Sequence, residues 1–141
     1  MVLFSIIFYR ILFHDQMPAK FMPTLFIMIA PPAVGFLDYF RLTNSLDALA
    51  LSLLNLSIFF SFLVIFMYRN FLKLKFFLSW WAFTFPTAAA SIAFFKAYNI
   101  TNSTFFATLA IGAFIILILM IFFISLHTIK NILNGAIFMG D

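Results

Sequence analysis

The sequence predicts an all-α integral membrane protein, and three observations support this fold class. Of the 141 residues, 66% are hydrophobic and only 9% are charged, which is more apolar surface than one small soluble core can hide. The apolar residues gather in four runs of helix-spanning length, at residues 23–40, 48–68, 76–96 and 103–126. The basic residues stand at the ends of these runs, so the net charge of +4 reports membrane topology and not a nucleic-acid-binding face.

The N-terminal segment, residues 1–13, is apolar but too short to cross a bilayer, and Arg10 interrupts it. A signal peptide carries its positive charge before the apolar run, whereas here Arg10, His14 and Asp15 come at or after its end. We interpret the segment as the second half of a helix whose beginning is absent. Residues 1–141 are therefore expected to form a single transmembrane domain that is the C-terminal fragment of a longer protein.

The run at residues 23–40 is interrupted by the adjacent pair Pro31 and Pro32. Two successive prolines remove successive backbone hydrogen bonds from a helix, so a kink or an unwound turn is expected here. The polar stretch that follows is short enough to be a tight turn, and Asp47 at its end is placed to cap the next helix.

The runs at residues 48–68 and 103–126 contain no proline and only one glycine, Gly112, and both are rich in leucine, isoleucine and phenylalanine. They are predicted to be smooth outer helices. The polar residues of the first run, Asn55 and the serines at positions 52, 57 and 61, are expected to form hydrogen bonds to other helices. His127 and Lys130 mark the predicted exit of the last helix.

The run at residues 76–96 is broken at its centre by Pro86, which four small residues follow. At about 100° per residue, one stripe of this helix, roughly 100° wide, holds the small residues and a single ring, Phe85. The stripe consists of Leu78, Ala82, Phe85, Pro86, Ala89, Ala93 and Lys96. Phe83 lies about 160° around the helix from Phe85, on a bulky face suited to contact with lipid or to packing.

Two interpretations of this small-residue stripe remain open. Small residues commonly let another membrane helix approach closely, in which case Phe85 fills a gap in that contact. Alternatively, the stripe lines a cavity that the ring of Phe85 occludes. Pro86 fits both interpretations, because the carbonyl that it frees must find a partner in protein or in water.

Helices with prolines alternate with smooth helices along the chain, which predicts a repeated helical hairpin in which the kinked helix faces inward and the next helix supports it. Charge assigns the two sides of the membrane. Six of the eight basic residues fall on the side of the C-terminus, namely Arg10, Lys20, Arg69, Lys73, Lys75 and Lys130. Only Arg41 and Lys96 fall on the opposite side. The C-terminus is therefore predicted to be cytoplasmic.

Titratable residues suited to catalysis or metal binding are scarce, since the chain has four aspartates, two histidines and neither glutamate nor cysteine. None of them stands at a metal-ligand or catalytic spacing on one helix face. We therefore expect no enzyme activity, no metal and no cofactor. Asp38, near the end of a broken helix, is expected either to neutralise Arg41 or to line a vestibule.

Two motifs, APPAVGF at Ala30 to Phe36 and SWWAFTFP at Ser79 to Pro86, resemble the tellurite-resistance/dicarboxylate transporter family, which is related to the plant slow anion channels. The resemblance implies ten spans in five hairpins, with the kinked odd-numbered helices around the pore of each protomer of a homotrimer. This chain then corresponds to the end of span six and to spans seven to ten. Phe85 matches the phenylalanine that plugs the pore in that family. The residues expected to line the pore or form its kinks are Pro31, Pro32, Ala33, Gly35, Ala82, Pro86, Ala89 and Ala93.

The resemblance implies transmembrane transport of anions or C4-dicarboxylates, with this chain supplying the C-terminal pore helices. The expected partners are the lipid bilayer, small anions, the missing N-terminal half and two further copies in a trimer, and nucleic acid is not expected. The implied location is a bacterial inner membrane. The alternative function is a non-conducting structural subunit, or a truncated remnant, that packs against other helices.

Overall fold

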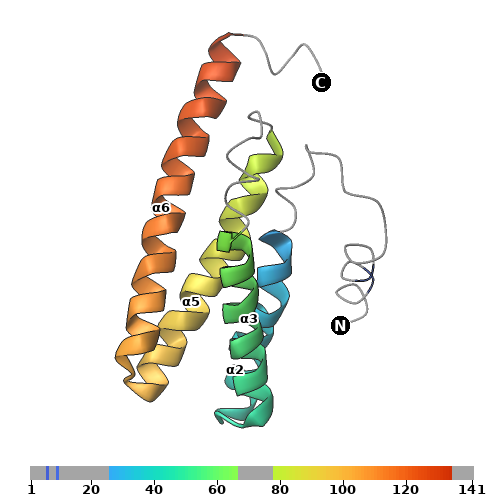
Figure 1. Ribbon diagram of the computed structural model, residues 1–141, viewed down its shortest axis with the longest axis vertical. Helices are drawn as coiled ribbons and strands as arrows, with labels where there is room; N and C mark the ends of the chain where they lie inside the picture. Colours follow the sequence, from blue (N-terminus) through green and yellow to red (C-terminus); the bar gives the residue numbers. More distant parts are fainter. Residues whose placement is uncertain (1–5, 7–8, 10–25, 67–77, 135–141) are drawn as a thin grey trace.

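The computed structural model describes residues 6, 9, 26–66 and 78–134, and these segments contain helices and turns but no strand (Figure 1). The helices are α2 (Ala30–Thr43), α3 (Ala48–Phe66), α5 (Thr84–Thr101) and α6 (Thr104–Leu133), with a 3₁₀ helix, η2 (Leu78–Phe83), ahead of α5. The predicted half-helix over residues 1–13 and the basic loop at residues 69–75 lie almost wholly outside the described residues.

Both proline-containing helices begin in the same way. Pro31 and Pro32 stand in the first turn of α2, directly after a 3₁₀ turn over residues 26–29, and Pro86 is in the first turn of α5, directly after η2. Proline is tolerated in a first turn because the backbone N–H groups there have no partner within the helix. The backbone irregularity that the sequence predicts at the prolines is thus a change from 3₁₀ to α-helix.

The turns that close the two hairpins are alike. Asn44 after α2 and Asn102 after α5 adopt the left-handed conformation, with φ of 51° and 52°. Their backbone N–H groups donate to the carbonyls of Phe40 and Tyr98, at 2.8 and 2.7 Å. Asparagine is, after glycine, a residue that tolerates this conformation at a helix end. Each proline-led helix is therefore followed by a tight turn and an antiparallel smooth helix.

Asp47 caps α3, which confirms the prediction from the sequence. Its Oδ1 accepts hydrogen bonds from the backbone N–H groups of Leu49 and Ala50, both at 3.1 Å. The hydroxyl of Tyr39 on α2 donates to Oδ2 of the same carboxylate, so the cap also ties the two helices of the hairpin together.

The cap makes stability depend on pH. The hydrogen bond from Tyr39, and next that from the Ala50 amide, holds the pKa of the Asp47 carboxyl below its ordinary value of 3.8. A lowered folded pKa contributes stability above the unfolded pKa, and this contribution is lost as pH falls through the folded value. Asp47→Ala is expected to lower the melting temperature of the detergent-solubilised protein at pH 7 by a few degrees. Asp47→Asn keeps a capping oxygen and should lose only the pH dependence below 3.8. Equal melting temperatures for the wild type and the alanine variant at pH 7 would contradict a stabilising cap.

The last helix is longer than the sequence indicates. It was expected to end at residue 126, but α6 continues to Leu133. Polar side chains beyond residue 126 bond within the helix: Thr128 Oγ1 donates to the carbonyl of Ile124 at 2.8 Å, and His127 Nδ1 lies 3.0 Å from that of Phe123. At 1.5 Å per residue the helix is about 45 Å long, which exceeds the roughly 30 Å hydrocarbon layer.

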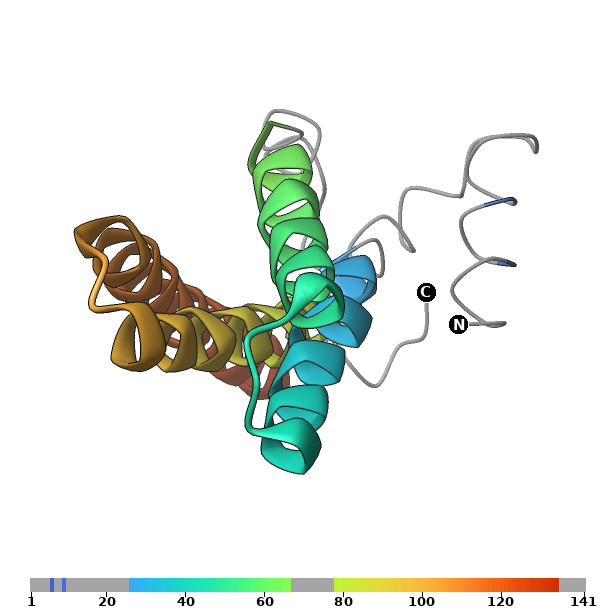
Figure 2. The same ribbon diagram turned by 90° about the horizontal axis from the view of Figure 1, so that it is seen from below.

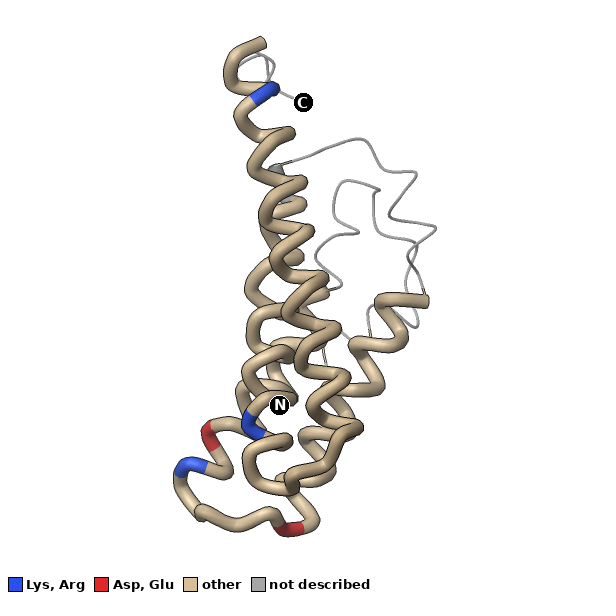
Figure 3. Tube along the Cα trace, turned by 90° about the vertical axis from the view of Figure 1, so that its left-hand side faces the viewer, with Lys and Arg blue, Asp and Glu red and all other residues tan. Residues whose placement is uncertain are grey.

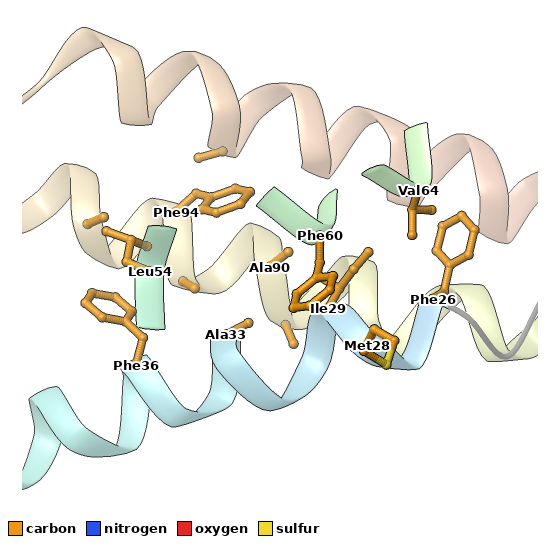
Figure 4. Packing of buried hydrophobic residues seen from close by; sticks show 14 of the residues in the cluster. Phe26, Met28, Ile29, Ala33, Phe36, Leu54, Phe60, Val64, Ala90 and Phe94 are labelled. Atoms are coloured by element: carbon orange, nitrogen blue, oxygen red, sulfur yellow. The ribbon is translucent and has the colours of Figure 1, made fainter. Parts of the chain in front are cut away.

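The core lies along α5, which runs between α6 on one side and α2 with α3 on the other (Figure 2). Small side chains at the contacts let the backbones approach, since Ala33, Ala93 and Ala110 are all fully buried. Larger side chains fill the remaining space, and Phe36 of α2 meets Leu54 of α3 beside Phe94 of α5 (Figure 4).

Serines of α3 do not bond to other helices as expected. The hydroxyls of Ser52 and Ser61 donate to the carbonyls of Ala48 and Ser57, one turn back in the same helix, at 2.7 and 2.8 Å. The prediction of interhelical bonds is therefore wrong for these two serines. Such back-bonding satisfies a hydroxyl locally when no polar group of a neighbouring helix is within reach.

Two of the helices, α3 and α6, are long and apolar enough to cross a membrane. In the apolar window of α6 only 11% of the residues are buried, so most of this surface is apolar and exposed and suits lipid. Charged residues of the described segments lie only at the two ends of the bundle (Figure 3). The described part of the chain is accordingly all-helical, and its two long apolar helices indicate an integral membrane protein.

Candidate functional site

Two neighbouring phenylalanines at the start of α5 have opposite environments. Phe85 is 66% exposed, whereas Phe83 is 4% exposed. The Phe83 ring packs against Phe26, with centroids 4.3 Å apart, and against Trp80 at 5.5 Å. The helical wheel separates the same two rings, and the structure identifies Phe83 as the packing residue. Phe85 is left facing outward from this chain.

The small residues predicted to share the face of Phe85 are mostly inside the bundle. Pro32, Ala33, Pro86, Ala89 and Ala93 are buried, Gly35 and Ala82 are half-buried, and Pro31 is exposed. A Cβ added at Gly35 would lie 3.5 Å from the Leu53 side chain of α3, so this glycine is also in a helix contact. Burial agrees with the packing interpretation for most of the stripe, and a pore-lining role for these residues stays a prediction.

Each of the two proline-led helices carries exposed and half-buried side chains along one side, and we call these residues together the α2–α5 face. The helices run in the same direction and pack against each other (Figure 1), and their exposed residues recur at helical spacing. The α2–α5 face comprises Pro31, Val34, Asp38 and Arg41 of α2 with Phe85, Ile92 and Lys96 of α5. The sequence-based prediction favoured small residues, so it did not include Val34 and Ile92 in this face. The seven-residue spacing from Phe85 to Ile92, which is two helical turns, indicates that these two side chains share a face.

One end of the α2–α5 face is hollowed and charged. A concavity of about 360 Å³ lies between the helices. Its lining consists of Val34, Leu37, Asp38, Arg41, Ile92 and Lys96. Because Phe85 precedes Lys96 by 11 residues of α5, about 16 Å of helix separates the ring from this end. The face therefore passes from an apolar, aromatic region to a basic one.

Lys96 is held in place by an aromatic contact. Its Nζ lies 4.9 Å from the centroid of the Phe40 ring on α2, a cation–π distance. Phe40 is itself buried and adjoins Arg41 in sequence, so the contact brings the charge on α5 to the end of α2 that carries the arginine.

Asp38 does not neutralise Arg41 by direct contact. Neither residue forms an ion pair with any described residue. Of the two roles that the sequence leaves open for Asp38, the concavity agrees with the vestibule. Asp47, the other acidic residue of this region, is occupied by the cap and by Tyr39.

A second, apolar groove lies on another side of α5. It measures about 420 Å³ and is formed by residues of α3, α5, η2 and α6, with Ser61, Thr87 and Thr108 as its few polar side chains. The Thr87 hydroxyl donates to the carbonyl of Phe83 at 2.7 Å. Among the described residues, no group of three His, Asp, Glu or Cys side chains could hold a metal ion.

Two smooth apolar helices are thus each paired with a proline-led helix that carries a basic residue, Arg41 or Lys96, towards its C-terminal end. The profile of the SLAC1 family, described as voltage-dependent anion channel, matches residues 1–129. The chain belongs to this family, which confirms the resemblance to the transporters related to plant slow anion channels. A family of channels and transporters is consistent with the expectation of no enzyme activity.

Similar proteins come from a plant and an archaeon. The S-type anion channel SLAH3 of Arabidopsis thaliana is 29% identical over 92% of this chain and 20% of its own length. The S-type anion channel SLAH2 of the same plant is 30% identical over 68% of this chain and 18% of its own. The uncharacterized transporter MJ0576 of Methanocaldococcus jannaschii is 22% identical over 99% of this chain and 44% of its own. This chain thus spans 18% to 44% of the length of these relatives, and no solved structure matches it.

Proposed function

We propose that this chain supplies pore helices for transmembrane transport of anions, including C4-dicarboxylates. In this proposal α2, α3, α5 and α6 are four membrane spans in two hairpins, with α2 and α5 on the pore side and α3 and α6 outside. The observation that carries the proposal is the α2–α5 face, where an exposed phenylalanine and a basic concavity lie on the two helices that contain prolines. The names of SLAH3 and SLAH2 as anion channels support the same substrate class.

The pore requires further helices. Two helices present one wall, and charged groups such as Asp38, Arg41 and Lys96 on that wall need water or protein opposite them within a membrane. We propose that the N-terminal half found in relatives, whose sequences extend well beyond the match, completes the pore in a homotrimer. We propose a cytoplasmic C-terminus in a bacterial inner membrane, with the Asn44 turn outside, and the distribution of basic residues supports this orientation.

Phe85 is the proposed gate of this pore. It is the most exposed ring of α5 and stands near the middle of the predicted span, at residues 76–96, where the 3₁₀ turn meets the α-helix. A phenylalanine side chain rotates about two χ angles, so its ring can leave the axis of a lumen while the backbone stays in place.

A non-conducting subunit is the alternative function, and one observation favours it. Pro86, Ala89 and Ala93 are buried within the bundle, which supports a packing role for much of the small stripe. A packing role for the small stripe does not account for the exposed ring of Phe85 or for the basic concavity.

Anion flux into liposomes tests the function directly. The chain is purified alone and also as a fusion behind the N-terminal spans of the archaeal relative, and chloride, nitrate and malate uptake are measured. We expect anion uptake by liposomes that contain the fusion protein and no uptake by empty liposomes. A fusion that is folded and trimeric by size but passes none of the three anions would favour the structural subunit.

Accessibility to thiol reagents tests which residues face water, and the chain has no cysteine of its own to interfere. Ile92→Cys, at an exposed position, is expected to react with a membrane-impermeant maleimide in the fusion protein, and its neighbour Ala93→Cys, at a fully buried position, is expected to be protected. A difference in rate of about tenfold or more is expected. Equal protection of both would place the α2–α5 face in lipid or in a helix contact. Thr43→Cys, labelled in intact cells, checks the orientation.

A further inference from the structure

We propose that Arg41 and Lys96 form a cationic mouth that concentrates small anions at the outer end of the α2–α5 face. The inference rests on the proposed function and deepens it, because it assigns the residues that attract the anion before it reaches Phe85. These residues come from different hairpins, 55 positions apart, and only the fold brings them to one concavity.

The local charge of the concavity is positive. Arg41 and Lys96 outnumber Asp38, and the three side chains share one hollow without forming an ion pair among the described residues. Asp47 does not reverse this balance, since its carboxylate accepts hydrogen bonds from Tyr39, Leu49 and Ala50. The charged residues that line the hollow therefore sum to one net positive charge.

The shape of the site strengthens the field of these charges. Apolar side chains, Val34, Leu37 and Ile92, form the remainder of the wall, and low-dielectric walls around a charged cleft focus field lines and raise the local concentration of counter-ions. Lys96 is fixed by its contact with the Phe40 ring, so its charge stays at the mouth. A site that faces water and holds no built cage binds an anion weakly, as conduction requires.

The ligand class that fits is a small anion with one or two charges that retains most of its water. A hollow of about 360 Å³ has room for such an ion. Its walls offer one guanidinium and one ammonium, which attract chloride, nitrate or a short carboxylate by charge more than by shape.

The electrostatic potential in the hollow is measurable without any transport. Ile92→Cys places a thiol in the lining, and its reaction rates with an anionic and a cationic methanethiosulfonate of similar size are compared in the purified chain in neutral detergent. We expect the anionic reagent to be favoured by about tenfold relative to a reference thiol, 2-mercaptoethanol in free solution, which no protein charge surrounds. A ratio equal to that of the reference would overturn the inference.

Charge variants identify the source of the preference. Lys96→Gln and Arg41→Gln are each expected to reduce the ratio severalfold, Asp38→Asn to increase it, and Lys96→Arg to preserve it. The preference should fade between 10 mM and 1 M salt, because the Debye length falls from about 30 Å to about 3 Å. If Lys96→Gln and Lys96→Arg both lose the preference for the anionic reagent, Lys96 acts through the structure and not through its charge, and the inference is contradicted.

Flux measurements separate this inference from the proposed function. In the fusion protein, Lys96→Gln with Arg41→Gln is expected to lower chloride uptake severalfold at low salt and to approach the wild-type rate at 1 M salt. Absence of flux in the wild type, with the reagent preference intact, would refute the proposed function and leave the cationic mouth standing. Flux that the charge variants do not change at any salt concentration would refute the mouth.

Lipid phosphate is the other source of negative charge at a membrane surface. Anionic phosphatidylglycerol, added to the neutral detergent at a few molecules per protein, should leave the reaction rate of Ile92→Cys unchanged if the hollow serves soluble anions. Protection by that lipid but not by 0.1 M nitrate would assign the basic pair to headgroup binding and overturn the inference.

Discussion

Phe85→Ala is expected to raise anion flux through the fusion protein by about tenfold or more, which corresponds to lowering a barrier by about 1.4 kcal/mol. The ring is 66% exposed and has few neighbours within the chain, so its removal should cost little stability. The measurement is the initial rate of chloride uptake at equal reconstituted protein, together with the melting temperature of each variant. Unchanged flux at normal stability would remove Phe85 from the gate.

Phe83→Ala is the matched control, two residues away. This ring is buried between Phe26 and Trp80, and truncation of a buried phenylalanine costs about 3 to 5 kcal/mol. The variant should therefore melt earlier or express poorly, with no increase in flux per folded molecule. If both alanine variants behave alike, a single gating ring is the wrong description of this helix.

Ala93→Leu is expected to lower stability by overpacking the helix contact. Ala93 is fully buried at the centre of α5, where a small side chain allows the helices to approach, and added methyl groups force the backbones apart at a cost of about 1 to 3 kcal/mol or more. Thermal unfolding in detergent, followed by circular dichroism, gives the shift in melting temperature.

Ala88→Leu adds the same atoms at a half-buried position five residues earlier. A leucine there can extend past the edge of the contact, so a much smaller shift is expected. Equal shifts for the two variants would indicate that α5 is loosely packed. The comparison also decides between the two interpretations of the small stripe, because a side chain lining a lumen tolerates added volume without loss of stability.

Local chemistry made part of the fold predictable from the sequence. The positions of the prolines, the polar turn ending in Asp47 and the apolar runs depend on residues within one or two helical turns, and the structure has helices, a cap and hairpins there. The end of α6 was misjudged because His127 and Lys130 were taken as an exit, while a helix continues through polar residues that bond to its own carbonyls.

The candidate site was predictable only where a single helix defines it. Periodicity alone separates Phe85 from Phe83. Burial of Ala89 and Ala93, in contrast, depends on where neighbouring helices cross α5, and the meeting of Arg41 with Lys96 depends on how two hairpins dock. These are long-range packing decisions, and no spacing along one helix encodes them.

The matching turns at Asn44 and Asn102 have a consequence for how such a chain is assembled. Each hairpin enters and leaves on the same side, because a left-handed asparagine reverses the chain at once between two antiparallel helices. Insertion into the bilayer can therefore proceed in pairs, with each pair bringing its own supporting helix and leaving the sidedness of the others unchanged. A fold made of such pairs can gain or lose a pair, or be divided between two polypeptides, without inverting what remains.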